Sequence, residues 1–150
     1  MKSWGRRAFV KRSGEACLGL GCLGWIVSLE SCVANYLVES TEQTDKVIID
    51  KSVLVDTESG DKRKFVTVQS QRFKESIYLG GIENEQYTAV LTHCTHKGCE
   101  VRPAGDILIC PCHGSEFSAT GKVLKSPAEA DLLRFKVSED DQKVYIHLTR

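Results

Sequence analysis

Two short segments near the middle of the chain, each rich in cysteine and histidine, constrain its fold more than any other feature. They read CTHKGC at residues 94–99 and CPCHGS at residues 110–115. In each segment a cysteine is followed within two or three residues by a histidine, so each can supply two metal ligands from one tight loop. The fold must therefore bring two separate loops together around one metal centre.

The spacing of these residues favours a centre with two metal ions. A pair of irons bridged by sulfides needs two ligands for each iron, and Rieske centres are those in which two histidines replace two thiolates on one iron. The segments match C-T-H-x-G-C and C-P-C-H-G-S. Over roughly residues 75–148 the chain resembles the disulfide-containing Rieske proteins of cytochrome bc1 and b6f complexes.

The resemblance implies a role for each cysteine and histidine of the two segments. It implies one [2Fe-2S] cluster with four protein ligands: Cys94, His96, Cys110 and His113. The two cysteines would hold one iron as thiolates, and the two histidines would hold the other through imidazole nitrogen. Cys99 and Cys112 would form a disulfide that joins the loops.

This ligand set predicts the redox behaviour of the centre. With only two thiolates the oxidised centre is formally neutral, so an electron enters it more easily than it enters a four-thiolate centre. We expect electron uptake to be coupled to proton uptake, because the metal lowers the proton affinity of a bound imidazole. The histidine side of the centre should be exposed at the tip of the domain.

Four further positions belong to the surroundings that the resemblance implies. Ser115 matches a serine whose hydroxyl donates to a bridging sulfide. Phe117 replaces a tyrosine that donates to a ligand cysteine, so we predict a lower potential than in tyrosine-bearing relatives. Lys97 replaces a leucine that packs against cytochrome b, and its charge favours either an acidic soluble partner or a side chain that extends out of the interface. Pro127 lies in SPA, which resembles the proline loop that covers the cluster.

The amino terminus is basic and then apolar. Residues 16–29 form an uncharged, mostly apolar run, shorter than the roughly 20 residues of a spanning helix but within the roughly 7–15 of an export signal. The preceding GRRAFVK at residues 5–11 resembles a twin-arginine signal. We therefore expect export to the periplasmic side of a bacterial cytoplasmic membrane. An uncleaved anchor over residues 16–38 and lipidation at Cys32 remain alternatives.

The rest of the chain predicts an all-β domain. Short segments rich in β-branched and aromatic residues, several of them alternating, predict strands. They lie at residues 47–49, 52–55, 64–68, 76–79, 86–91, 107–109, 132–137 and 143–148. The resemblance implies a Rieske-type antiparallel β-sandwich with the cluster between two loops at its tip. We divide the chain into a signal or membrane anchor (1–32), a linker or hinge (33–45) and a Rieske domain (46–150).

Charge and composition narrow the class of protein. The formal net charge is zero, which does not suggest nucleic acid as a partner. From residue 32 onward the chain carries 15 basic and 18 acidic side chains. No nucleophile–base arrangement is visible, so we expect an electron-transfer subunit of an oxidoreductase rather than a complete enzyme.

Several roles are compatible with such a centre. The first is the iron–sulfur subunit of a quinol-oxidising bc-type complex, with cytochrome b and c subunits as partners and membrane association through the amino terminus. The second is a stand-alone exported carrier or the small subunit of another periplasmic oxidoreductase. A dioxygenase ferredoxin fits less well, because such ferredoxins lack the disulfide cysteines and the signal. A structural zinc site is the remaining alternative, although zinc usually binds Cys-x-x-Cys knuckles.

Overall fold

The computed structural model describes residues 37, 38 and 40–149. Of the two compact units into which the chain divides, residues 1–32 and 33–150, only the second contains described residues. The predicted signal or anchor and the lipidation at Cys32 therefore lie outside them. In the described residues no helix has the length and apolar character needed to cross a bilayer.

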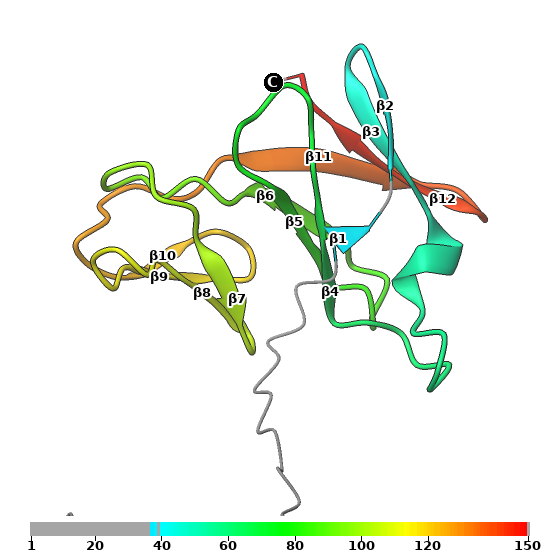
Figure 1. Ribbon diagram of the computed structural model, residues 1–150, viewed down its shortest axis with the longest axis horizontal. Coiled ribbons are helices and arrows are strands. Elements are labelled where there is room, and N and C mark those ends of the chain that lie inside the picture. The colour runs from blue at the N-terminus through cyan, green and yellow to red at the C-terminus, as the bar shows by residue number, and fades with distance from the viewer. Residues whose placement is uncertain (1–36, 39, 150) are drawn as a thin grey trace, which may run out of the picture. The chain divides into compact units, whose positions relative to one another are not determined.

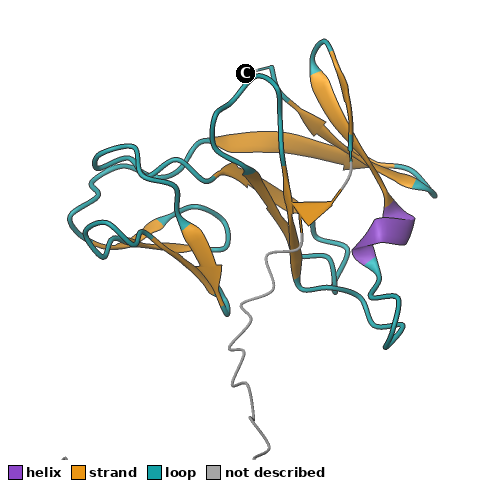
Figure 2. Cartoon of the chain, in the orientation of Figure 1, coloured by secondary structure: helices purple, strands orange, loops and turns teal. Residues whose placement is uncertain are grey.

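The described part is built almost entirely from strands, as the coloured cartoon shows (Figure 2). The larger sheet has the order β1-β4-β5-β6-β11-β12-β3-β2. Its strands are β1 (Leu37–Val38), β2 (Thr41–Gln43), β3 (Lys46–Asp50), β4 (Phe65–Val68), β5 (Ile77–Gly80), β6 (Thr88–Leu91), β11 (Arg134–Glu139) and β12 (Lys143–His147). The smaller sheet has the order β10-β9-β8-β7 (Figure 1). Its strands are β7 (Arg102–Ala104), β8 (Ile107–Ile109), β9 (Glu116–Ser118) and β10 (Val123–Lys125).

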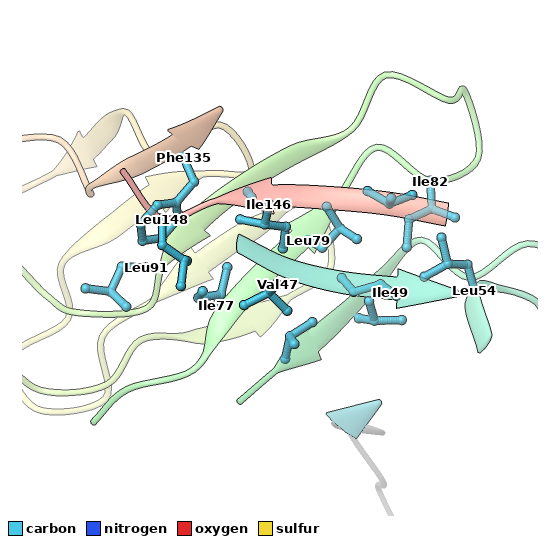
Figure 3. Packing of buried hydrophobic residues seen from close by; sticks show 14 residues of the cluster. Val47, Ile49, Leu54, Ile77, Leu79, Ile82, Leu91, Phe135, Ile146 and Leu148 are labelled. Atoms are coloured by element: carbon cyan, nitrogen blue, oxygen red, sulfur yellow. The ribbon is translucent and has the colours of Figure 1, made fainter. Parts of the chain in front are cut away.

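The larger sheet encloses the first of two hydrophobic cores (Figure 3). Fully buried side chains from β3, β12, β4 and β5 all belong to this core, among them Val47, Ile146, Val66 and Leu79. Along β3 and β12 these buried residues alternate with more exposed ones, as expected for strands with one face on a core. The sheet therefore curls so that its two halves cover the same apolar interior.

A second core joins the larger sheet to the smaller one. Every residue of β5 is buried, because both of its faces are covered. Ile77 and Leu79 face the first core, while Tyr78 and its cross-strand partner Val90 belong to the second. Phe117 of the smaller sheet belongs to the second core as well. Strands β4, β5 and β6 thus form a middle layer between the smaller sheet and the rest of the larger sheet.

The structure confirms the all-β class and corrects some of the predicted elements. Strands predicted at 47–49, 64–68, 76–79, 86–91, 107–109, 132–137 and 143–148 correspond to β3, β4, β5, β6, β8, β11 and β12. The strand predicted at 52–55 is wrong. Residues Lys51–Leu54 form a 3-10 helix, η1, because the Asp50 carboxylate accepts a hydrogen bond from the Ser52 N–H and caps a turn there.

Five short strands were not predicted: β1, β2, β7, β9 and β10. Strands β1 and β2 lie within the stretch expected to be a linker, where Val38 packs against the first core and β2 pairs with β3. β1 also departs from the antiparallel pattern, because it pairs with β4 in parallel.

Candidate metal centre

The two cysteine–histidine segments form loops with the same backbone geometry. In the first loop (residues 94–99) the Cys94 N–H donates to the Cys99 carbonyl at 2.9 Å, and the Gly98 N–H donates back to the Cys94 carbonyl at 2.8 Å. The second loop (residues 110–115) repeats both bonds around Cys110, at 2.8 and 3.0 Å. Gly98 and Gly114 both have a φ of 76°. A side chain is disfavoured in this left-handed conformation, which explains a glycine at the same point of each loop.

The four cysteines of these loops divide into a bonded pair and two free thiols. Cys99 and Cys112 form a disulfide that joins the first loop to the second. Cys94 and Cys110 are free and only 1% exposed. The sulfur atoms of Cys99, Cys110 and Cys112 lie within 4.8 Å of one another. Because two of these three are oxidised in the disulfide, only Cys110 among them can serve as a thiolate ligand.

The two histidines lie beside each other. Their ring centroids are 4.8 Å apart and the rings are nearly perpendicular. His96 is half-buried, and His113 is exposed. The Nδ1 atom of His96 is buried and has no hydrogen-bond partner in the described part of the chain. A buried polar atom without a partner is costly, and metal coordination is a common use of an imidazole nitrogen in such a position.

These residues fit the donor set of a Rieske centre. Two buried thiols and two adjacent imidazoles can provide the two thiolates and two nitrogens that such a cluster takes from its protein. The buried thiols are shielded from water, whereas the imidazole side is open. The arrangement can therefore hold a metal cluster with one pair of ligands in the interior and the other near the surface.

A third segment, residues 126–131, is bonded to the second loop. It begins with a cis peptide between Ser126 and Pro127. The N–H of Ala128 donates to the hydroxyl oxygen of Ser115 at 3.0 Å, and both residues are buried. This bond uses a lone pair of the serine oxygen, so the hydroxyl hydrogen is available for an acceptor at the centre.

The same segment is bonded to the first loop through a residue for which the sequence predicted no role. The hydroxyl of Thr95 donates to the carbonyl of Ala130 at 2.5 Å. The third segment therefore restrains both loops, one through Thr95 and the other through Ser115. No sequence signal distinguished Thr95, because a threonine next to a ligand cysteine has no obvious partner until the third segment is placed.

Glu100 is a second residue that sequence reasoning missed. One of its carboxylate oxygens accepts from the Ser76 hydroxyl at 2.7 Å and from the Ser76 N–H at 3.3 Å, and it lies 3.4 Å from the Thr92 hydroxyl. Ser76 directly precedes β5, and Thr92 is 1% exposed. These bonds tie the base of the first loop to the middle layer. The sequence does place Ser76 and Thr92 at the ends of apolar strands, and this was the available signal that these polar residues have a partner such as Glu100.

Phe117 and Lys97, the two residues that replace the tyrosine and the leucine expected from the resemblance, have opposite surroundings. Phe117 is fully buried and shares the second core with the thiols of Cys94 and Cys110. Lys97 is exposed. It is the third residue after Cys94, as His113 is the third residue after Cys110, so Lys97 and His113 occupy matching positions in the two loops.

Comparisons with known proteins show the family to which the chain belongs. A family model described as the Rieske [2Fe-2S] domain matches residues 37–137. The cytochrome b6-f complex iron-sulfur subunit of Chlorobaculum tepidum is 38% identical over 63 residues, which cover 41% of this chain and 35% of that protein. The match thus spans about a third of this curated relative.

Solved structures are also similar to this chain. The cyanobacterial plasma membrane Rieske protein PetC3 from Synechocystis PCC 6803 is 32% identical, with a TM-score of 0.49, and the match covers 55% of this chain and 85% of that one. The quaternary ammonium Rieske monooxygenase CntA in complex with L-carnitine is 18% identical, with a TM-score of 0.54. That match covers 70% of this chain and 32% of CntA, and it shows likeness of fold.

Replacing Glu100 by glutamine should weaken the fold in a pH-dependent way. The hydrogen bond from the Ser76 hydroxyl holds the pKa of the Glu100 carboxyl below its ordinary value of 4.5. A lowered pKa means that the carboxylate stabilises the folded state at neutral pH, and that this contribution disappears as the pH falls through the folded-state pKa. Glu100→Gln should therefore reduce the free energy of unfolding at pH 7 by up to about 1 kcal/mol, and by less at lower pH.

Urea unfolding followed by circular dichroism at several pH values measures this difference. Glu83→Gln is the matched control, because Glu83 is exposed like Glu100 but has no hydrogen bond or ion pair within the described residues. Its free energy of unfolding should equal that of the parent at every pH. An effect of Glu100→Gln that stays equally large at acidic pH would contradict the assigned role of the carboxylate.

Proposed function

Since this chain belongs to the Rieske [2Fe-2S] domain family, we propose that it transfers single electrons as the iron–sulfur subunit of a quinol-oxidising complex of the bc type. Its domain binds one [2Fe-2S] cluster, and the chain is a Rieske iron–sulfur electron carrier homologous to b6-f iron-sulfur subunits. When bound, the cluster supplies a one-electron redox couple. The observation that carries the proposal is the pair of buried thiols beside two adjacent imidazoles on matched loops.

The proposed ligands follow from the state of each side chain. Cys94 and Cys110 would bind one iron, because they are the free thiols of the two loops and both are buried. His96 and His113 would bind the other, and the unpartnered Nδ1 of His96 supports this assignment. Cys112 is unsuited as a ligand because its sulfur is already bonded to Cys99.

Restraint of the loops is the second contribution of this chain. The disulfide joins two cysteines 13 positions apart in the sequence, which stabilises the fold by roughly 3 kcal/mol in the chain-entropy model. The third segment adds one hydrogen bond to each loop, through Thr95 and Ser115. Loops held in this way keep the ligands in place when the charge of the centre changes. The exposed His113 leaves one side of the site open to a redox partner, and we propose that electron uptake there is coupled to proton uptake.

The assignment to a bc-type complex is supported by relatives named as subunits of cytochrome b6-f complexes. We propose export by the twin-arginine-like signal in residues 1–32, and partners of the cytochrome b and c type on the periplasmic side of the membrane. A stand-alone exported carrier, or the small subunit of another periplasmic oxidoreductase, is the second candidate. The exposed charge of Lys97 favours that candidate, because a lysine does not suit an apolar interface.

Purification of the protein from native membranes distinguishes these two roles. Membranes are solubilised in mild detergent, the tagged chain is recovered, and the accompanying proteins are identified by mass spectrometry. If the chain is a subunit of a bc-type complex, a cytochrome b should co-purify with it in a comparable amount. Recovery without any cytochrome, together with a form released into the periplasmic fraction, would contradict the first role and support the second.

Replacing Phe117 by tyrosine should raise the midpoint potential. The new hydroxyl would lie in the buried core shared with Cys94 and Cys110, where a hydrogen bond to a ligand sulfur is its best partner. That bond favours the more negative reduced state. A bond to a charged acceptor contributes about 1.5 kcal/mol, so the rise should be on the order of 60 mV at about 59 mV per tenfold change.

Protein-film voltammetry or a redox titration measures the potential of the variant and of the parent chain. The control is Phe73→Tyr, which adds the same hydroxyl beside the first core, away from the centre. Its potential should equal that of the parent. A Phe117→Tyr protein with an unchanged or lower potential would show that Phe117 does not set this property.

A further inference from the structure

The outward face of the larger sheet carries a row of basic side chains. Along β11, β12 and β3, alternate side chains point into the first core and the intervening ones point outward. The strand register places Lys136 opposite His147, His147 opposite Lys46, and Lys46 opposite Gln43. Arg134 lies two residues before Lys136 on β11 and therefore on the same face. Arg134, Lys136 and Lys46 define what we call the cationic face.

The charge of this face contrasts with that of the chain. From residue 32 onward acidic side chains outnumber basic ones, yet the row contains no acid. Asp50 and Asp140 lie toward the other end of the same strands, close to Lys143. The ammonium group of Lys46 lies 5.2 Å from the centre of the Tyr145 ring, which leaves its positive charge uncancelled. Lys136 and Lys46 lie on β11 and β3, on either side of β12, and neither forms a cross-strand pair with an acid on this face.

The row begins beside the second core and runs away from it: Arg134 lies opposite Val90 of β6, a member of that core, and Lys46 lies two strands further along the sheet, on β3. The first core lies on the inner side of β11, β12 and β3, and the middle layer of β4, β5 and β6 lies between that core and the smaller sheet. Figure 1 shows β2, β3 and β12 on one side of the domain and β7 to β10 on the other. A partner that exchanges electrons must approach the loops at residues 94–99 and 110–115. Lys46 is separated from β6 by β11 and β12, and this end of the cationic face is therefore poorly placed to receive one.

We propose that the cationic face binds the anionic head groups of a phospholipid bilayer and orients the domain on the membrane. An anionic membrane surface attracts each nearby lysine or arginine, over a range set by the Debye length. Tyr145 stands beside Lys46 on the same face, and its hydroxyl donates to the Asp140 carboxylate at 2.6 Å, so its ring rather than its hydroxyl is available at the boundary between head groups and water. A broad sheet surface with this chemistry fits a bilayer better than it fits a small ligand. The proposal goes beyond the proposed function and holds for a complex subunit and for a free carrier.

Lysine footprinting of the full, cluster-containing chain tests the proposal. The protein is mixed with vesicles of phosphatidylcholine alone or of phosphatidylcholine with phosphatidylglycerol, acetylated briefly, and analysed by mass spectrometry. Lys46 and Lys136 should be protected several-fold on the anionic vesicles only, and added salt should remove the protection. Lys97 and Lys122, exposed lysines outside the cationic face, should be acetylated at the same rate on both vesicles.

Two double variants distinguish vesicle binding by the cationic face from binding by the basic amino terminus. The amino terminus is identical in both variants and in the parent. The double variant Lys46→Gln with Lys136→Gln should bind anionic vesicles more weakly by roughly fivefold for each lysine removed. Its control, Lys64→Gln with Lys122→Gln, has the same net charge and should bind like the parent. Equal protection of all four lysines, or equal binding by both double variants, would overturn the proposal. An acidic protein partner would then be the better candidate for the cationic face. The visible absorbance of the cluster, recorded on the same samples, reports the redox centre independently.

Discussion

Restraint of the two ligand loops is the constraint on which the rest of this structure depends. Each loop closes on itself through two backbone hydrogen bonds around its first cysteine, and a left-handed glycine makes that closure possible. These bonds fix the shape of each loop but not the position of one loop relative to the other. That position is set by the disulfide between Cys99 and Cys112, and by a third segment that hydrogen-bonds to both loops.

The sheets behind the loops also help to restrain them. The smaller sheet is too short to bury a core alone, and it packs on the middle layer through Tyr78, Val90 and Phe117. Glu100 adds polar bonds from the base of the first loop to the start of β5. Because β5 is buried on both faces, a change in the middle layer affects both cores. The larger sheet acts as a rigid base from which the loops project.

Local patterns in the sequence predicted the chemistry better than they predicted the framework. Spacing alone grouped Cys94 with His96 and Cys110 with His113, because ligands on one tight loop lie close together in the chain. Family membership and the single cluster are confirmed by the match over residues 37–137. The ligand assignment itself stays a prediction, supported by the buried thiols and by the unpartnered nitrogen of His96.

What the sequence did not predict depends on contacts between distant residues. The bonds of Thr95 with Ala130 and of Glu100 with Ser76 join residues 35 and 24 positions apart, and no local pattern marks them. The strand predicted at 52–55 failed for a different reason. Its apolar residues suit a strand, but capping by Asp50 turns the chain into η1 instead.

The claim that two thiolates and two histidines hold the cluster is tested most directly by magnetic resonance on the reduced protein. Electron–nuclear double resonance on a sample with nitrogen-15 in its histidines reports which imidazole nitrogens share the unpaired electron. We expect couplings to two histidine nitrogens, one each from His96 and His113. A paramagnetic signal without histidine coupling would indicate four thiolates and contradict the assignment. A protein with no such signal after reduction would point to zinc instead.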